Sequence, residues 1–167
     1  LTNPRLREQA GELRLVDPAD RVSGPGTTPI MAAFTHPNPH GSRFSDGSYG
    51  VYYCARTVET AIHETRFHRE RFLRYSAEPP IMLEMRVYYA DIRETLHDLR
   101  GPRKRRPAWL DPDRYDASRK LGRALKDARS YGALYPSVRH PGGECAAVLR
   151  PAALAPARQG EHYGYYW

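Results

Sequence analysis

Residues 50–64 read Gly50-Val51-Tyr52-Tyr53-Cys54-Ala55-Arg56-Thr57-Val58-Glu59-Thr60-Ala61-Ile62-His63-Glu64. β-Branched and aromatic side chains over residues 51–54 favour a short strand. The hydroxyl of Thr57 can cap a helix that begins at Val58, and the acidic Glu59 in the first turn favours that helix start. The stretch therefore predicts a strand, a turn and a helix in direct succession.

Further elements are predicted on both sides of this unit. Apolar and polar residues alternate over 81–89, which is typical of a strand with one buried face. Helical spacing predicts a helix over 115–129, and two short strands, 133–135 and 145–149, follow with a polar turn between them. Residues 30–34 are expected to form a first strand. Hairpin-like strands and separated helices indicate a single α+β domain with a mainly antiparallel sheet and flanking helices.

Length and composition fit one compact domain with a hydrophobic core. The chain has 167 residues, of which 40% are hydrophobic. Residues 1–28 are charged and then rich in turn-forming residues, so we expect an N-terminal arm there. The folded domain is expected over residues 29–155. Residues 156–167 are expected to form an aromatic C-terminal tail that packs on the domain or against a partner.

The net charge and the cysteines indicate which partners and which cellular compartment to expect. The formal net charge of +7 favours an anionic partner, such as a nucleotide, a nucleic acid or an acidic protein, and is equally compatible with a role in solubility. Cys54 and Cys145 lie in separate apolar runs, which indicates reduced core thiols rather than a disulfide or a metal pair. Neither a signal peptide nor a membrane span is predicted, so we expect a cytoplasmic protein.

Three polar residues around the strand and helix are candidates for a ligand site. Arg43 can offer a bidentate pair of donors to a pyrophosphate, although a solvated loop arginine has the same sequence context. Tyr53 can stack on a positively charged ring such as nicotinamide, although strand tyrosines often belong to the core. Glu64 falls on the apolar flank of its helix, where a carboxylate needs a partner or a function. Together these groups fit the chemistry of NAD⁺ cleavage.

A second polar segment, residues 134–144, joins the last two predicted strands. Ser137 can hold a ribose or an amide group through its hydroxyl, and Arg139 can bind phosphate. A serine nucleophile is not indicated, because the chain lacks the Gly-x-Ser-x-Gly elbow. Rossmann-type binding of NAD⁺ is not indicated either, because the chain lacks a Gly-x-Gly-x-x-Gly motif.

The sequence also contains features that resemble a metal site and a nucleic-acid-binding site. His63 and His68 are five residues apart, about 140° around a helix axis, whereas a zinc-binding helix places its two histidines four apart, so we expect no metal. The basic run over residues 100–106 can contact nucleic acid, but a solvated or partner-facing loop explains it as well. The run also lacks the interleaved aromatic residues with which single-strand binders stack on bases.

Three blocks of this sequence resemble the RES domain, the toxin of bacterial RES-Xre toxin-antitoxin pairs. The blocks are Gly41-Ser42-Arg43-Phe44-Ser45-Asp46-Gly47, residues 51–64, and Gly132-Ala133-Leu134-Tyr135-Pro136-Ser137-Val138-Arg139. The resemblance covers about residues 30–155. It implies a fold related to ADP-ribosyltransferase toxins of the diphtheria type, NAD⁺ as the substrate, and a small Xre-like antitoxin that covers the active site and is the only link to DNA.

The resemblance also implies roles for residues. The arginine, tyrosine, glutamate and serine conserved in the family fall on Arg43, Tyr53, Glu64 and Ser137. This implies a catalytic site of Tyr53, Glu64 and Ser137, with NAD⁺ bound by Arg43, Tyr53 and Ser137 and by Arg139 as a further ligand.

One departure from the family concerns the predicted first strand. Many RES domains carry an arginine directly after an aromatic residue there, whereas Phe34 is followed by Thr35 and His36 in this chain. We expect His36 to replace that arginine and to bind the adenosine ribose of NAD⁺. A loop histidine without such a role is the alternative.

The expected reaction breaks the nicotinamide–ribose bond of NAD⁺ and transfers ADP-ribose to an acceptor, with Glu64 stabilising the cationic transition state. A protein acceptor is favoured, because of the basic surface and the altered first strand. Hydrolysis or phosphorolysis that depletes cellular NAD⁺ is the alternative. A ribonuclease or nucleic-acid-binding toxin and a pure interaction module are more remote, because neither accounts for Arg43, Tyr53 and Glu64 together.

Overall fold

The computed structural model describes residues 11–76, 79–101 and 107–166. The helices are α2 (Thr28–Thr35), α3 (Val58–Ser76) and α4 (Asp116–Asp127), and the short 3-10 helices are η1 (Leu13–Leu15), η2 (Pro18–Asp20), η3 (Ala108–Leu110) and η4 (Pro151–Ala153). The strands are β1 (Tyr52–Ala55), β2 (Met82–Tyr89), β3 (His97–Asp98), β4 (Gly132–Pro136), β5 (Glu144–Val148) and β6 (Arg158–Tyr166).

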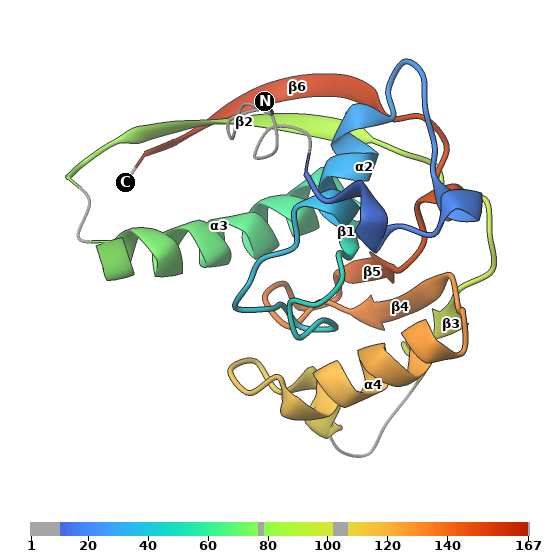
Figure 1. The fold of residues 1–167 in the computed structure, drawn as a ribbon. Helices are drawn as coiled ribbons and strands as arrows, with labels where there is room; N and C mark the ends of the chain where they lie inside the picture. The colour runs from blue at the N-terminus through green and yellow to red at the C-terminus, as the bar shows by residue number, and fades with distance from the viewer. Residues whose placement is uncertain (1–10, 77–78, 102–106, 167) are drawn as a thin grey trace.

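The strands form two separate sheets (Figure 1). The larger sheet has the order β1-β5-β4-β3, in which β5 is antiparallel to both of its neighbours and β3 is parallel to β4. The smaller sheet is an antiparallel ribbon of β2 and β6. The prediction of an α+β domain with mainly antiparallel pairing is therefore confirmed.

The core surrounds β5, which is buried on both faces of the larger sheet. Ala147 belongs to a core cluster against which Leu121 of α4 packs. Its neighbour Val148 belongs to a second cluster, together with Ile30 and Phe34 of α2. Because successive side chains of a strand point to opposite faces, the unbroken apolar run that predicted β5 is typical of a strand covered on both sides.

The prediction of a strand over residues 30–34 is wrong, because α2 forms there. Pro29 lies in the first turn of α2, where its fixed φ angle favours a helix. Ile30 and Phe34 are four residues apart and are both buried, so they share the helix face that packs on the sheet. A five-residue apolar run has no clear period, and its packing partners decide between strand and helix.

The strand and helix around residues 50–64 are confirmed. β1 ends at Ala55, and the hydroxyl oxygen of Thr57 accepts a hydrogen bond from the amide of Thr60 at 3.2 Å. α3 then begins at Val58. The short connection brings the polar groups at the end of β1 close to those on the first turns of α3.

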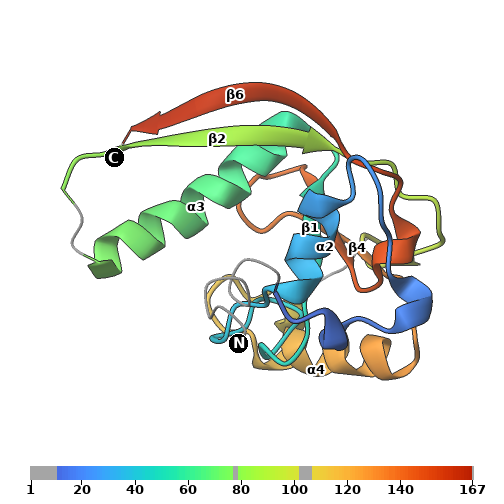
Figure 2. The same cartoon turned by 45° about the horizontal axis from the view of Figure 1, so that its top comes forward.

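The β2–β6 ribbon arches over α3 in both ribbon views (Figures 1 and 2). Leu83, Met85 and Val87 on one face of β2 are half-buried, and the residues between them are exposed, as the alternation predicts. A hydrogen bond of 2.8 Å between the hydroxyls of Thr65 and Tyr165 joins α3 to β6. Most of the predicted C-terminal tail is thus a paired strand.

The described part of the predicted N-terminal arm, residues 11–28, packs on the domain. Val16 is buried in the cluster around Ile30. Asp20 is 5% exposed, and its carboxylate accepts hydrogen bonds from Nε and Nη2 of Arg150 at 2.7 to 3.0 Å. Residues 1–10 of the predicted arm lie outside the described residues.

No helix within residues 11–76, 79–101 and 107–166 combines the length and the hydrophobicity that crossing a membrane requires.

Buried acidic groups make the fold sensitive to alkaline pH. Burial raises the pKa values of Tyr49, Tyr52, Tyr53 and the Cys145 thiol to about 12. It also raises the pKa of Tyr135 well above the ordinary value for tyrosine. Tyrosine in an unfolded chain ionises near pH 10, so between about pH 10 and 12 the unfolded state binds fewer protons than the folded state. We expect the urea midpoint to be constant from about pH 7 to 9 and to fall steeply above about pH 10. A midpoint that stays constant to about pH 11.5 would contradict this expectation.

Candidate active site

Glu64 of α3 and Ser137 in the turn between β4 and β5 are in direct contact. The Ser137 hydroxyl donates a hydrogen bond to Oε1 of Glu64 at 2.6 Å. Its oxygen accepts hydrogen bonds from the amides of Arg139 at 3.2 Å and His140 at 2.9 Å. The two amides orient the hydroxyl, and its proton points to the carboxylate. A short bond of this kind to a carboxylate holds Glu64 in one orientation.

The two cysteines are free thiols, as the sequence indicates. Sγ of Cys145 lies 3.8 Å from Oε1 of Glu64. Burial raises the Cys145 pKa to about 12, and the neighbouring Glu64 raises it as well. Burial also raises the pKa of Cys54 to about 11. Both groups are therefore protonated near pH 7 and are poor nucleophiles.

Tyr53 lies on β1 next to the loop that carries Arg43. Its hydroxyl oxygen accepts a hydrogen bond from the amide of Phe44 at 2.9 Å and is 2.8 Å from the Ser42 hydroxyl. Burial of this end of the side chain raises the Tyr53 pKa to about 12. The residue as a whole is 37% exposed. Since the hydroxyl is enclosed by its partners, the ring is the part of the side chain that can contact a ligand.

Arg43 is held inside the protein and is not the solvated loop arginine that its sequence context also allows. The residue is 8% exposed, and Nη1 donates hydrogen bonds to the carbonyls of Trp109 at 3.3 Å and Asp111 at 2.8 Å. The guanidinium carbon lies 4.7 Å from the centre of the Tyr115 ring. Both hydrogen bonds that Arg43 makes to other described residues come from Nη1. Nε and Nη2 therefore remain as donors for a ligand.

Helix α4 fixes the loop that carries Arg43. Arg119 donates hydrogen bonds to the carbonyls of Ser42 at 3.1 Å and His40 at 2.7 Å. A Cβ atom on Gly122 would lie 2.0 Å from the carbonyl oxygen of Phe44. Only a glycine lets the helix approach the loop backbone this closely.

Arg139 is held between α3 and the segment that precedes α4. Its guanidinium carbon lies 3.3 Å from the centre of the Phe67 ring, on α3. Its Nη2 donates a hydrogen bond to the carbonyl of Pro112 and lies 4.0 Å from a carboxylate oxygen of Asp113. The side chain is mostly buried, so the position of its charge beside α3 is well defined.

His68 belongs to the same neighbourhood, one helical turn after Glu64. Partial burial of the ring lowers the His68 pKa; the Glu64 carboxylate opposes this shift, and the charges of Arg139 and Arg43 add to it. The neutral form of the imidazole is therefore favoured, although the residue as a whole is exposed. In the sequence, His68 is four residues after Glu64, which indicates only a pair of side chains on one face of a helix. The sequence gives no sign that Arg43 and Arg139 also lie near His68.

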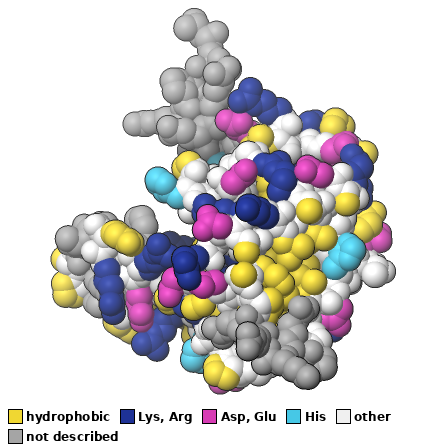
Figure 3. All heavy atoms as spheres, turned by 90° about the horizontal axis from the view of Figure 1, so that it is seen from below, with side chains coloured by type: hydrophobic (Ala, Val, Ile, Leu, Met, Phe, Trp, Pro, Cys, Tyr) yellow, Lys and Arg dark blue, Asp and Glu magenta, His cyan; other side chains and the backbone are white. Residues whose placement is uncertain are grey.

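The structure brings Arg43, Tyr53, Glu64, Ser137 and Arg139 into one region. Tyr53, Glu64 and Arg43 all act electrostatically on the ionisation of the buried Tyr135. Figure 3 shows Lys and Arg side chains, with Asp and Glu side chains among them, where the lobe at the left of this face joins the rest of the molecule. The five residues named at the start of this paragraph are the candidate active site.

His36 lies in a different place. It follows α2 as its C-terminal cap residue, and its Nδ1 is 3.1 Å from the hydroxyl of Thr35. It lines an open hollow of about 1020 Å³ together with residues 11–15 and 47–48, and none of the five candidate site residues lines that hollow. The predicted contact of His36 with the adenosine ribose stays a prediction.

The basic run over residues 100–106 is described only in part, because residues 102–106 lie outside the described chain. Arg100 donates a hydrogen bond to Asp98 and forms an ion pair of 3.0 Å with Glu144. Its charge is therefore shared with two carboxylates rather than presented alone to a nucleic acid.

The three sequence blocks that carry the residues of this site lie within a match to a known protein family. The sequence model of the RES domain matches residues 18–167, so the chain belongs to the RES domain family. RES domains are found in the toxins of RES-Xre toxin-antitoxin systems. An uncharacterized protein, y4oC of Sinorhizobium fredii (strain NBRC 101917 / NGR234), is 31% identical over 169 residues, covering 99% of this chain and 68% of its own length.

The matched range extends beyond the predicted domain at both ends. It includes the end of the predicted arm and the whole C-terminal tail. This agrees with the packing of Asp20 on Arg150 and with the pairing of β6 to β2. Membership of the family places the chain among proteins that act as toxins together with an antitoxin partner.

Proposed function

We propose that this chain cleaves the bond between nicotinamide and ribose in NAD⁺ and transfers ADP-ribose to an acceptor. The observation that carries the proposal is the hydrogen bond of 2.6 Å from Ser137 to Glu64. It holds a carboxylate in one orientation, in the same region as Arg43, Arg139 and Tyr53. As the bond lengthens, positive charge develops on the ribose, and a fixed carboxylate stabilises this oxocarbenium ion.

The other residues bind and orient the substrate in this proposal. Arg43 and Arg139 attract the pyrophosphate, and both are already desolvated and positioned, so little freedom is lost on binding. The ring of Tyr53 stacks on the cationic nicotinamide. Ser137 orients Glu64 with its single hydroxyl proton. An ADP-ribosyltransferase-like fold, action in the cytoplasm and an Xre-like antitoxin that covers this site are parts of the same proposal.

The proposed step balances without a metal or a redox partner. The bond from ribose C1′ to the nicotinamide nitrogen breaks, and its electron pair stays on nicotinamide, which leaves as a neutral molecule. A lone pair of the acceptor forms the new bond to C1′, and the acceptor loses a proton. Neutral His68 is a candidate to take up this proton. We favour a protein as acceptor, because the net charge of +7 favours contact with an acidic protein surface.

The test is nicotinamide release from NAD⁺ labelled in its adenylate part, with purified protein alone and with an added cell lysate. We expect release and acid-stable label on a protein of the lysate. Free ADP-ribose would identify water as the acceptor, and phosphorylated ADP-ribose would identify phosphate. If no nicotinamide is released under any of these conditions, the proposed reaction is wrong.

Tyr53 variants separate the role of the ring from that of the hydroxyl. Tyr53→Ala is expected to raise KM for NAD⁺ about tenfold, because it removes the stacking surface. Tyr53→Phe keeps the ring but loses the hydrogen bonds to Phe44 and Ser42, so we expect KM to stay within about threefold of wild type. Steady-state kinetics of nicotinamide release measure both values. Equal effects of the two changes would argue against stacking, provided that both variants unfold at the same urea concentration.

A further inference from the structure

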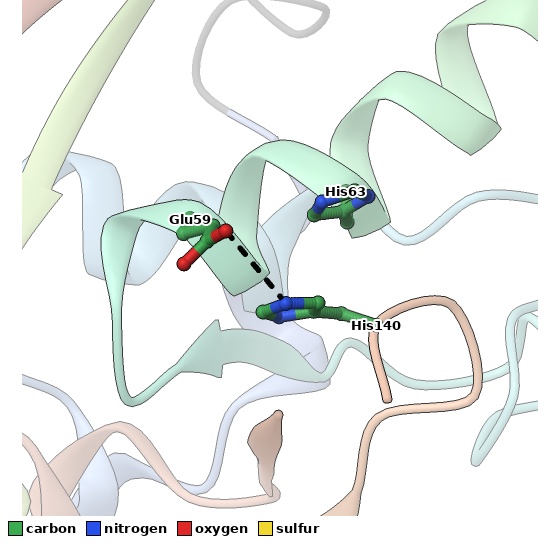
Figure 4. Close-up of side chains that lie close together, drawn as sticks. All are labelled: Glu59, His63 and His140. Carbon is green, nitrogen blue, oxygen red and sulfur yellow. Dashed lines mark ion pairs between the residues drawn. The ribbon is translucent and has the colours of Figure 1, made fainter. Parts of the chain in front are cut away.

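A second cluster of polar side chains lies beside the candidate active site. Glu59 and His63 are four residues apart and share one face of α3, and His140 faces them from the turn between β4 and β5 (Figure 4). Their potential ligand atoms all lie within 4.8 Å of one another. Nε2 of His140 is 3.9 Å from Oε1 of Glu59, and the two imidazole rings are stacked with their centres 4.6 Å apart.

The contact between His140 and Thr60 occupies Nδ1 of the imidazole and leaves Nε2 for a metal ion. Nδ1 of His140 lies 2.9 Å from the hydroxyl of Thr60, which is 1% exposed. When Nδ1 donates to this hydroxyl, the lone pair of the ring is on Nε2, which faces Glu59. Histidines that bind metals usually donate their second ring nitrogen to a fixed acceptor in this manner.

We propose that Glu59, His63 and His140 bind one Zn²⁺ ion. Two imidazoles and a carboxylate are a donor set that zinc commonly takes, with water in the fourth position. Ligand atoms around tetrahedral zinc are about 3.4 Å apart, somewhat closer than in this cluster. The exposed His63 ring therefore turns out of its stack on binding. The Glu59 side chain is 74% exposed and is free to follow.

The sequence argument against a metal considered only two histidines on the same helix. It did not consider a ligand from a distant part of the chain. His63 and His68 are indeed on different sides of α3, but the ligands of the proposed site are His63, Glu59 on the same face, and His140 from a distant turn. The amide of His140 also donates to the Ser137 hydroxyl at 2.9 Å. A bound ion would therefore tie the start of α3 to the turn that holds Ser137. The metal site does not depend on the reaction proposed above.

The test is zinc binding by the full chain, purified without a histidine tag and freed of metal with a chelator. Isothermal titration with Zn²⁺ is expected to give one ion per chain. His63→Ala and His140→Ala are each expected to weaken the affinity at least about tenfold. His97→Ala is the matched control, because His97 is an exposed histidine on β3, outside the cluster. Titration with Co²⁺ should add a visible absorption band that His63→Ala abolishes.

Two results would overturn the proposal. One is the absence of zinc binding by the wild-type chain. The other is an affinity in His63→Ala equal to that of wild type, which would place the ion elsewhere. His63 is exposed, so its loss should leave the fold intact, and circular dichroism verifies this. If His140→Ala fails to fold, His63→Ala and Glu59→Gln decide the outcome, because both change exposed side chains of α3.

Discussion

Glu64→Gln is expected to lower kcat for nicotinamide release about 10²- to 10³-fold, with a much smaller change in KM for NAD⁺. The amide removes the negative charge that stabilises the cationic ribose, but its carbonyl oxygen still accepts the hydrogen bond from Ser137. The substitution therefore tests charge with little change in structure. Steady-state rates at saturating NAD⁺ measure the effect, since an interaction made only in the transition state appears in kcat.

Glu70→Gln is the control for this prediction. Glu70 lies on the same helix and pairs with Arg66 at 2.7 Å, away from Ser137. Its rate should equal that of wild type. Ser137→Ala removes the orienting hydroxyl and keeps the carboxylate, so we expect a smaller loss of kcat than in Glu64→Gln. A Glu64→Gln protein with wild-type kcat would show that the carboxylate does not act in the reaction.

Asp20→Ala is expected to lower the free energy of unfolding by about 3 to 5 kcal/mol. Asp20 accepts three hydrogen bonds from Arg150, whose side chain is 17% exposed and lies over the Tyr131 ring at 4.3 Å. The substitution leaves the arginine with little water and without its carboxylate partner. Urea denaturation at pH 7 measures the difference.

Glu70→Ala is the matched comparison for Asp20→Ala. It breaks the ion pair with Arg66, whose side chain is 67% exposed, and a solvent-exposed pair four residues apart on a helix contributes less than about 1 kcal/mol. A loss of less than about 1 kcal/mol in Asp20→Ala would mean that residues 11–28 contribute little to the stability of the domain. The large loss that we expect would make this segment an integral part of the fold.

Much of the secondary structure could be predicted because it depends on neighbours in the chain. Thr57 caps α3 three residues from its partner amide, and α4 follows from apolar spacing within twelve residues. β2 follows from alternation alone. Residues 30–34 could not be assigned in this way, since a short apolar run fits either state. Their burial between the sheet and Val16 selected the helix.

The sequence predicted which residues belong to the candidate site, but it did not predict the contacts that these residues make. Arg43, Tyr53, Glu64 and Ser137 were selected from the chemistry of their side chains and from a family resemblance. The tethering of Arg43 to the carbonyls of Trp109 and Asp111, and the presence of His68 beside both arginines, had no sequence signal.

The sequence by itself determined the α+β class, the strand and helix around residues 50–64, and the family, because each depends on residue order and local spacing. Only the tertiary structure decided that Ser137 donates to Glu64 and that His140 meets Glu59 and His63. These partners are far apart in the chain. They come together because β5 pairs with both β1 and β4, which places the β4–β5 turn beside the start of α3.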